Sequence, residues 1–534
     1  MAEVKTVKEQ EEEMRLRLNA YEGDEPFIFV SYSHADTMAV LRILKILDKE
    51  KFRFWYDDTM EIGEDFRNEL RDKIEKCSAM LLFISDASMQ SKYCGMEVIT
   101  AYKYDKRIYP VYISEDVVIP PALKLILENL QHVKGAANEN LNKYVAKLIS
   151  SLPVETMKSL ETDGEVLVKC KDGSTSLTVP AGIKIIGDSA FKNCEKLENI
   201  DFGDEVEVIK REAFRGCKGL KHVVLPESVR RVGDSVFRDC IAMESLVVEN
   251  EEIELGERTF ENCASLSSVK LRMGMTELYG GVFNSCKSLV EITLPEKLTV
   301  LGESSFADCV KLKKIVLPPE VSKVDDMAFN GCIELEEIVL NDKISKLGKN
   351  VFKDCKCLKS FYLPASVTSI GTGPFRGCSN LCKIVVDPKS RFFKAVDSVL
   401  FNKNKSVLIS YPAQLPAKNY SVPDSVTVIS DWAFCECSEL ETVFIPDSVY
   451  EIGEGAFYTC SALKRIEIPD SVVKIDDIAF RGCANLESIV IPSSVKEFGW
   501  GIFNGCENVT VICSDDSQAA KYCDSRNIPH RKNA

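Results

Sequence analysis

Residues 463–483 read LKRIEIPDSVVKIDDIAFRGC, and this stretch decides the fold because the chain repeats its pattern. A phenylalanine followed three residues later by a cysteine, as in Phe480 and Cys483, occurs thirteen times, nearly always at a spacing of 23 residues. The phenylalanines are Phe191, Phe214, Phe237, Phe260, Phe283, Phe306, Phe329, Phe352, Phe375, Phe434, Phe457, Phe480 and Phe503. Such a fixed period is the signature of a solenoid, in which each repeat stacks on the one before.

Within the repeat, Leu463, Ile466 and Ile468 alternate with polar residues, which predicts a short strand with one buried face. Pro469 ends the strand because proline has no amide hydrogen to donate to a ladder. A single repeat cannot bury both sides of its apolar residues, so stacking supplies the core. We expect thirteen repeats of 23 residues over residues 166–513, and residues 514–534, which lose the motif, to cap the array.

The register breaks once, between Phe375 and Phe434, which are 59 residues apart. The insert, at about residues 385–420, contains DSVLFNKNKSVLIS at 397–410, which predicts a hairpin that turns between Asn402 and Lys405. The repeat consensus closely resembles the BspA-like class of leucine-rich repeats, a family that commonly carries such a hairpin between arrays. The resemblance implies a surface that binds a protein or another ligand. A spacer or an oligomerisation scaffold is the alternative.

Composition excludes several classes of function. The net charge of −15 argues against binding to nucleic acid or to an anionic membrane surface. Residues 1–13 hold no apolar signal region, and the apolar run at 79–84 is too short to span a bilayer, so we expect a cytoplasmic protein with reduced cysteines. A straight row of cysteines does not converge on a metal ion, so the 13 ladder cysteines are interpreted as buried packing residues and no metal site is expected. Residues 1–24 form a charged arm to which we assign no function.

The N-terminal region alternates predicted strands and helices. We expect strands at 27–31, 52–56, 79–85 and 108–113, a weak fifth strand near 130–133, and helices at 38–48, 64–76, 91–104 and 138–152. This alternation is typical of a parallel sheet covered on both faces. Its size matches a five-stranded flavodoxin-like α/β domain over residues 25–152, joined to the repeats by a linker at 153–165.

Three motifs in this region resemble a known family. Residues 29–36 (FVSYSHAD), 52–58 (FRFWYDD) and 91–97 (SKYCGME) look like the three sequence boxes of the Toll/interleukin-1 receptor (TIR) domain, in the right order and spacing. Residues 62–66 (IGEDF) resemble the loop after its second strand. In a sheet of order 2-1-3-4-5, the loops after the first and third strands flank one crevice, where ligands bind. The resemblance also implies self-association of the domain.

Catalytic TIR domains hydrolyse NAD⁺ at the nicotinamide–ribose bond with a helix glutamate that matches Glu97. Nicotinamide leaves as a neutral molecule, so one carboxylate that stabilises the ribosyl cation can suffice. The resemblance therefore makes NAD⁺ the substrate and requires no cofactor. Carried over residue by residue, the resemblance implies that Tyr32, Ser33 and His34 contact the nucleotide. It also implies that the loop facing the nucleotide is shaped by Asp57, Gly63 and Phe66. Tyr93 stands where the family usually has tryptophan and could stack on the substrate.

Two other functions remain open at this stage. The TIR-like domain could be a non-catalytic adaptor that recruits other TIR proteins, with Glu97 an ordinary helix residue. The chain could also be a surface adhesin, as many BspA-like proteins are, although the missing export signal argues against that. The two resemblances together lead us to expect an intracellular sensor in defence signalling, whose repeats bind a partner.

Overall fold

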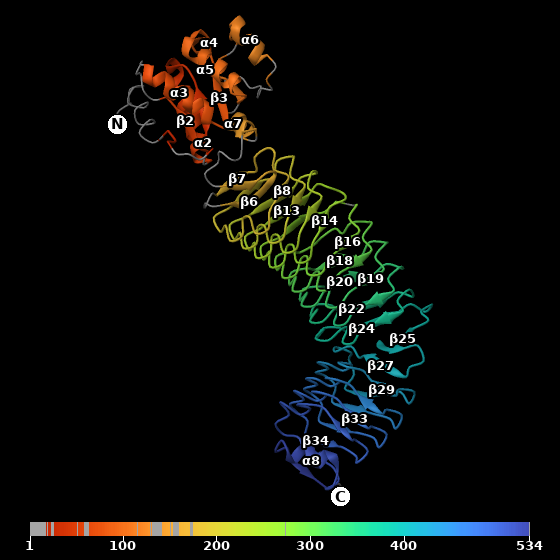
Figure 1. The fold of residues 1–534 in the computed structure, drawn as a ribbon. Helices are drawn as coiled ribbons and strands as arrows, with labels where there is room; N and C mark the ends of the chain where they lie inside the picture. The colour runs from red at the N-terminus through yellow and green to blue at the C-terminus, as the bar shows by residue number, and fades with distance from the viewer. Residues whose placement is uncertain are drawn as a thin grey trace, which may run out of the picture. The chain divides into compact units, whose positions relative to one another are not determined.

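The computed structural model describes residues 18, 20–22, 26–50, 52–57, 64–114, 116–128, 130, 141–149, 151–152, 160–170, 175–272 and 274–532. The chain divides into two compact units, residues 1–220 and 221–534. The first unit holds the N-terminal α/β domain and the first coils of the repeat array (Figure 1). Over these described ranges, no helix combines the length and the apolar character needed to cross a membrane.

The N-terminal domain is built on a parallel sheet with the strand order β2-β1-β3-β4. The strands are β1 (Ile28–Ser31), β2 (Phe54–Tyr56), β3 (Ala79–Ile84) and β4 (Arg107–Tyr112). Every residue of β1, β2 and β3 is buried, because helices cover both faces of the sheet. This confirms the predicted parallel α/β fold, and the order places β1 at the centre next to β3.

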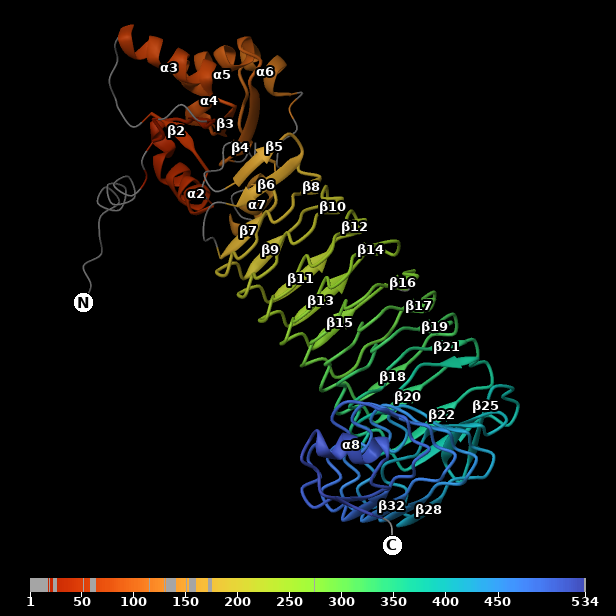
Figure 2. The same cartoon turned by 60° about the horizontal axis from the view of Figure 1, so that its bottom comes forward.

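The helices of this domain are α2 (Thr37–Lys49), α3 (Glu64–Lys76), α4 (Asp86–Gln90), α5 (Lys92–Lys103), α6 (Pro121–Leu127) and α7 (Leu141–Ile149). One face of the sheet packs against α3, α5 and α6, through side chains that include Ile74, Val98 and Leu123. Figure 2 shows α2 on the opposite face. The sheet is therefore covered by helices on both faces, and the loops that follow its strands lie at the ends of the strands.

One element expected in this domain lies outside the described residues, and one helix that the structure contains was not expected. The fifth strand expected near 130–133 falls almost entirely on residues 131–140, which lie outside the described part of the chain. Helix α6 was not predicted, because Pro120 and Pro121 indicate a loop in a sequence. Proline at the first helical position is compatible with a helix, since its missing amide hydrogen has no partner there.

The repeats form short parallel strands separated by tight turns; the strand at β32 (Arg465–Glu467) lies where the sequence predicts one, whereas the two-residue strands such as β33 (Lys474–Ile475) were not predicted. In the first unit the strands are β5 (Leu160–Asp163), β6 (Val166–Cys170), β7 (Ser176–Thr178), β8 (Ile185–Ile186), β9 (Asn199–Asp201) and β10 (Val208–Ile209). They pair in the orders β10-β8-β6-β5 and β9-β7. Only the β5–β6 pair is antiparallel, among the strands described in this unit, and it forms a hairpin at the start of the array.

The second unit continues the same pattern along two edges of each coil (Figure 2). Its short edge carries β12 (Arg231–Val232), β14 (Glu254–Leu255), β16 (Glu277–Leu278), β17 (Val300–Leu301), β19 (Lys323–Val324), β21 (Lys346–Leu347), β23 (Ser369–Ile370), β29 (Val428–Ile429), β31 (Glu451–Ile452), β33 (Lys474–Ile475) and β35 (Glu497–Phe498). The other edge carries β11 (His222–Leu225), β13 (Ser245–Val248), β15 (Ser268–Lys270), β18 (Lys314–Val316), β20 (Glu337–Val339), β22 (Ser360–Leu363), β24 (Lys383–Val386), β28 (Asn419–Ser421), β30 (Thr442–Phe444), β32 (Arg465–Glu467), β34 (Ser488–Val490) and β36 (Thr510–Ile512).

The repeated phenylalanines form stacked rows inside the coils. The rings of Phe306 and Phe329 are 5.7 Å apart between centroids and 5° from parallel, and Phe283 stacks on Phe306 at 5.5 Å. Phe306 and Phe329 have no exposed surface. Each ring is therefore enclosed by its neighbours in the sequence of coils, as a solenoid requires.

The ladder cysteines line the same core. The Cys309 thiol donates to the carbonyl oxygen of Phe283 at 3.1 Å, and Cys332 makes the same contact with Phe306 at 3.2 Å. Burial raises the pKa of the Cys309 thiol to about 12. These thiols are protonated and enclosed, as expected of packing residues rather than of reactive cysteines.

The insert lies where the hairpin is predicted. β26 (Val399–Asn402) and β27 (Val407–Ser410) pair antiparallel, and a further strand, β25 (Phe393–Val396), pairs with β26. The β27 strand then pairs in parallel with β29, which returns the chain to the repeat pattern. At the C-terminal end, α8 (Gln518–Asp524) buries Tyr522 and Cys523 against the last coils, and β37 (His530–Arg531) pairs with β36.

The first testable prediction concerns the phenylalanine rows. Phe306→Ala leaves a cavity between two fixed neighbours, and we expect a loss of about 3–5 kcal/mol in the free energy of unfolding. Urea unfolding followed by circular dichroism measures this loss. Val316→Ala, at a side chain that is 51% exposed, is the control and should change the free energy by less than about 0.5 kcal/mol. Equal effects of the two substitutions would contradict the stacked core.

Candidate functional site

The candidate site lies at the carboxyl end of β1, the central strand of the N-terminal sheet. The chain runs from β1 to β2 on one side and reaches β3 on the other, so the loops after β1 and β3 diverge here. In parallel α/β sheets ligands bind at this kind of switch point. The structure places polar side chains from three elements around it.

Glu97 of α5 reaches the end of β1. Its Oε2 atom accepts a hydrogen bond of 2.6 Å from the hydroxyl of Ser31, the last residue of the strand. Ser31 is buried, whereas the Glu97 side chain is half-buried. This contact joins two residues that are 66 positions apart, and it holds the carboxyl group at the switch point.

Two further titratable groups lie near this carboxyl group. His34 Nε2 is 3.7 Å from Asp57 Oδ2, and both side chains interact electrostatically with Glu97. His34 follows β1 and Asp57 follows β2, so the loops after two neighbouring strands converge on the helix residue. The structure therefore brings together three of the residues that the sequence predicts for the site.

Tyr32 and Ser33 hold the loop after β1 in place. The Tyr32 hydroxyl donates to the Asp57 carbonyl oxygen at 3.0 Å, and its ring meets the His34 ring edge-on at 5.5 Å. The Ser33 hydroxyl accepts from the Ala35 amide at 3.4 Å and caps a short 3-10 turn at His34–Asp36. Tyr32 is buried, so in this structure it joins the loops after β1 and β2.

Asp36 ties the same loop to the one after β3. The Ser85 hydroxyl donates to Asp36 Oδ2, and Ser85 also caps helix α4. The two loops expected to flank one crevice are therefore connected directly.

Tyr93, Gly63 and Phe66 are the remaining residues that the sequence predicts for the site. Tyr93 lies one turn before Glu97 on α5, and its side chain is 42% exposed. Gly63 lies outside the described residues, and so does the side chain of Phe66, although its backbone belongs to α3. Stacking by Tyr93 on the substrate and the shaping of the facing loop by Gly63 and Phe66 stay predictions, as do the nucleotide contacts of Tyr32, Ser33 and His34.

The environment changes the acidity of Glu97. Desolvation raises the pKa of its carboxyl group to about 7, although the Ser31 hydrogen bond and His34 lower the pKa. The negative charge of Asp57 raises the pKa further. A desolvated carboxyl group that titrates near neutral pH is typical of functional sites.

Cys94 lies one turn before Glu97 but is not a nucleophile in this environment. It is buried, and desolvation together with the neighbouring Glu97 raises the pKa of its thiol to about 11. The thiol therefore remains protonated at neutral pH.

Family comparisons agree with both halves of this architecture. The BspA type leucine rich repeat region matches residues 168–290, 276–407 and 411–522, and the TIR domain matches residues 28–149. The chain belongs to the BspA-type leucine-rich-repeat family. The α/β domain that carries Glu97 is a TIR domain.

The similar solved structures include several bacterial repeat proteins. A leucine-rich repeat protein from Bacteroides ovatus is 27% identical over 69% of this chain and 88% of its own, with a TM-score of 0.45. One from Eubacterium ventriosum is 26% identical over 47% and 67%, with a TM-score of 0.42. A leucine rich cell surface protein from Faecalibacterium prausnitzii is 23% identical over 70% and 98%, with a TM-score of 0.48. No curated protein matched the chain.

The domain combination gives the broad function. A TIR domain followed by leucine-rich repeats indicates a signalling or defence protein with protein-interaction repeats. Ser31 is the site residue that the sequence did not reveal. The available signal was a hydroxyl at the end of a fully apolar strand, which needs a buried partner.

The second prediction tests the environment of Glu97. Its pKa in the folded protein, about 7, exceeds its ordinary value of 4.5, so the folded protein holds this proton more tightly than the unfolded chain. Stability from this group is complete at low pH and is lost as the pH rises through about 7. Glu97→Gln removes the loss, so the variant TIR domain should melt several degrees higher than wild type at about pH 8 but not at about pH 4.5.

Trp55, buried in β2, reports this melting by fluorescence in full-length protein that carries Trp432→Phe and Trp500→Phe, since the chain has 3 tryptophans. Glu69→Gln, on the exposed surface of α3, is the control and should leave the melting temperature unchanged at both values of pH. If Glu97→Gln differed from wild type by the same amount at both values of pH, a carboxyl group that titrates near neutral pH would be refuted.

Proposed function

We propose that the TIR domain hydrolyses NAD⁺ when the protein is clustered, and that the repeats bind the partner that causes clustering. The observation that carries this proposal is the desolvated Glu97 carboxyl group at the end of β1, where it accepts a 2.6 Å hydrogen bond from Ser31. Catalytic TIR domains use a glutamate at this point of the motif. A single half-buried carboxylate at the switch point of a parallel sheet is the arrangement that this chemistry needs.

The reaction breaks the bond between the nicotinamide nitrogen and C1′ of the ribose. The bonding electrons leave with neutral nicotinamide, and positive charge develops on the ribosyl ring. The Glu97 carboxylate would stabilise that cation electrostatically. Attack by water at C1′, with loss of one proton, gives ADP-ribose, whereas attack by an adenine nitrogen of the same molecule gives a cyclic product.

The contacts around Glu97 fit this role. The Ser31 hydroxyl fixes the orientation of the carboxylate, and His34 favours its charged form. Asp57 lies near His34 and would add negative charge to the site. Tyr93, exposed one turn earlier on α5, would offer an aromatic ring for stacking.

The third prediction is the turnover test. Full-length protein tethered through a His-tag to nickel-bearing vesicles should release nicotinamide from NAD⁺, and Glu97→Ala should reduce the rate by at least about a hundredfold. Chromatography of the products measures both nicotinamide and ADP-ribose or its cyclic form. The Glu69→Ala variant is the matched control and should keep the wild-type rate.

If the tethered wild type and Glu97→Ala release nicotinamide at the same rate, the enzymatic proposal is wrong. The TIR domain would then serve as an adaptor, and it should capture other TIR domains without consuming NAD⁺.

The fourth prediction follows from the pKa of Glu97. Only the carboxylate stabilises a cation, so kcat/KM should rise with pH along a limb with an apparent pKa of about 7. Ser31→Ala removes a hydrogen bond that favours the charged form, so the limb should move to higher pH. A profile measured between about pH 5 and pH 9 tests this. If Ser31→Ala lowered kcat/KM by the same factor at every pH, Ser31 would not control the pKa of Glu97, and this prediction would be wrong.

A further inference from the structure

One coil of the repeat array lacks two side chains that its neighbours carry. In the coil of Phe283, residues 279–281 read Tyr-Gly-Gly, where the coils on either side read Gly-Glu-Arg at 256–258 and Gly-Glu-Ser at 302–304. Gly281 has a φ of 66°, the left-handed region that the neighbouring Arg258 and Ser304 also adopt, so the backbone path is unchanged. The exchange therefore removes side chains from the surface, while Phe283 still stacks on Phe260 and Phe306.

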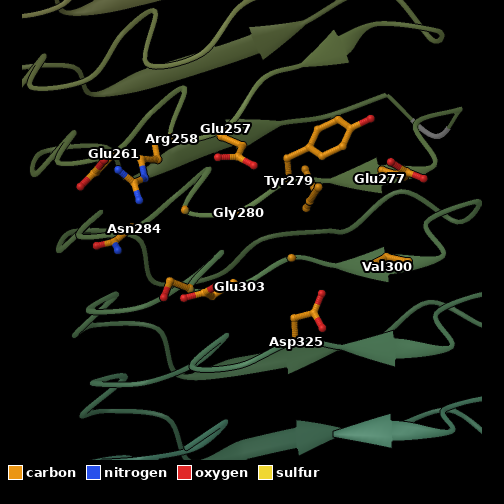
Figure 3. A pocket seen from close by; sticks show the side chains of 14 residues that line it. Glu257, Arg258, Glu261, Glu277, Tyr279, Gly280, Asn284, Val300, Glu303 and Asp325 are labelled. Atoms are coloured by element: carbon orange, nitrogen blue, oxygen red, sulfur yellow. The ribbon is translucent and has the colours of Figure 1, made fainter. Parts of the chain in front are cut away.

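The missing side chains leave a cavity of about 540 Å³ across neighbouring coils. This volume lies within the range of roughly 300–1,000 Å³ found for ligand pockets. Figure 3 shows Gly280 inside the cavity, with Glu257 on one side of it and Glu303 and Asp325 on the other. The hollow lies at a coil where the strand ladders are also interrupted, between β14 and β16 and between β15 and β18, and side chains from different coils border it.

An aromatic ring forms one wall of the gap. Tyr279 occupies a position that is glycine in both adjacent coils, and its side chain is 43% exposed. Hydrogen bonding to Glu277 raises the pKa of its hydroxyl. Tyr279 therefore offers an exposed aromatic ring at one end of the cavity.

Two carboxylates on the rim differ from the other three acids of the cavity, of which Glu277 hydrogen-bonds to Tyr279 and two lie in ion pairs. Glu261 faces Arg238 at 3.4 Å, and Asp325 pairs with Lys323 at 2.7 Å. Glu257 and Glu303 make no ion pair within the described ranges. Their negative charge is therefore available to a molecule that enters the cavity.

We infer that this cavity binds a lysine or arginine side chain of a basic peptide in a partner protein. The ring of Tyr279 would receive the cation or its aliphatic stem, and Glu257 and Glu303 would pair with its charge from opposite sides. This binding can be measured without NAD⁺ hydrolysis and stands if the hydrolysis proposal fails, because every residue involved belongs to the repeats.

Arg258 sets the position of the cation within the cavity. Figure 3 shows it grouped with Glu261 and Asn284, away from Tyr279. Its charge repels a cation from that end, so the cation lies at the end with Tyr279. Arg258→Gln should therefore leave the affinity unchanged or increase it.

The fifth prediction uses fluorescein-labelled hexalysine and full-length protein at roughly physiological ionic strength, with binding measured by fluorescence anisotropy. The double variant Glu257→Gln/Glu303→Gln should bind at least tenfold more weakly than wild type. Gly280→Thr narrows the gap at its middle without changing charge and should also weaken binding. Threonine occupies the same repeat position at Thr372, and its Cβ atom at 280 would approach no closer than 3.3 Å to the Glu303 carbonyl oxygen.

The matched control is Glu454→Gln/Glu467→Gln, which removes the same charge from coils without this gap. It should bind hexalysine within twofold of wild type. Tyr279→Phe, which keeps the ring, should also bind hexalysine within twofold of wild type. Tyr279→Ala should bind it several-fold more weakly. Absence of binding to wild type, or equal losses in the control and in Glu257→Gln/Glu303→Gln, would overturn the site, because the net charge of −15 alone attracts polycations.

Competition with spermidine separates a peptide from a free polyamine, which offers the same cationic groups. Unlabelled hexalysine should displace the probe at lower concentration than spermidine. The opposite order would overturn the peptide as occupant. Circular dichroism melting of each variant verifies that a loss of binding does not reflect a loss of folding.

Discussion

The structure depends on the fact that no coil of the array can bury its own apolar residues. Phenylalanine rings of adjacent coils cover one another, as Phe306 and Phe329 do, and ladder cysteine thiols donate to a phenylalanine carbonyl oxygen 26 residues earlier, as Cys332 does to Phe306. The side chains that face the interior are therefore fixed in type and spacing. Surface positions carry no such demand, so a coil can exchange them freely while the row of rings continues. The hollow beside Tyr279 illustrates this freedom, because Phe283 of the same coil still stacks on Phe260 and Phe306 of the two adjacent coils.

Most of the fold could be predicted because it follows from period and pattern. The 23-residue spacing defines the array, and apolar periodicity gives helix α3 with the same bounds that the structure has, Glu64–Lys76. Deviations from the pattern were harder to see. Residues 289–294 match the repeat consensus, yet Glu291 to Leu294 form no strand, and β15 and β18 are edges of separate sheets there. Strand pairing depends on how closely two adjacent coils approach each other, and the sequence of a single repeat does not encode that distance.

The candidate site was predicted only in its outline. The motifs gave Glu97, His34 and Asp57, because box order and strand order place them at one end of the sheet. The Ser31–Glu97 hydrogen bond depends on the distance between a strand and a helix residue 66 positions later, which the sequence pattern does not contain. The displaced pKa of Glu97 has the same origin, since desolvation is a property of the assembled domain.

Glu97 and the ion-paired acids of the array have opposite shifts of pKa. On the array, many acids lie in ladders with bases one repeat away, and Glu441 between Lys418 and Lys464 has a pKa lowered to about 2 by hydrogen bonds to both lysines. Such acids stay charged and solvated, so they are available for recognition but not for chemistry. Glu97 is held instead by a buried hydroxyl, and its pKa is raised.

Glu257 and Glu303 represent a third arrangement of the same side chain. They stand on the solvated surface of the array, but within the described part of the chain they lack the bases that complete other ladders. Their charge is therefore neither suppressed by burial nor neutralised by a neighbouring lysine, and an incoming cation can meet it. In our two proposals the same residue type would serve catalysis in the TIR domain and binding in the repeats, and the distinction would be made by desolvation in the first case and by pairing in the second.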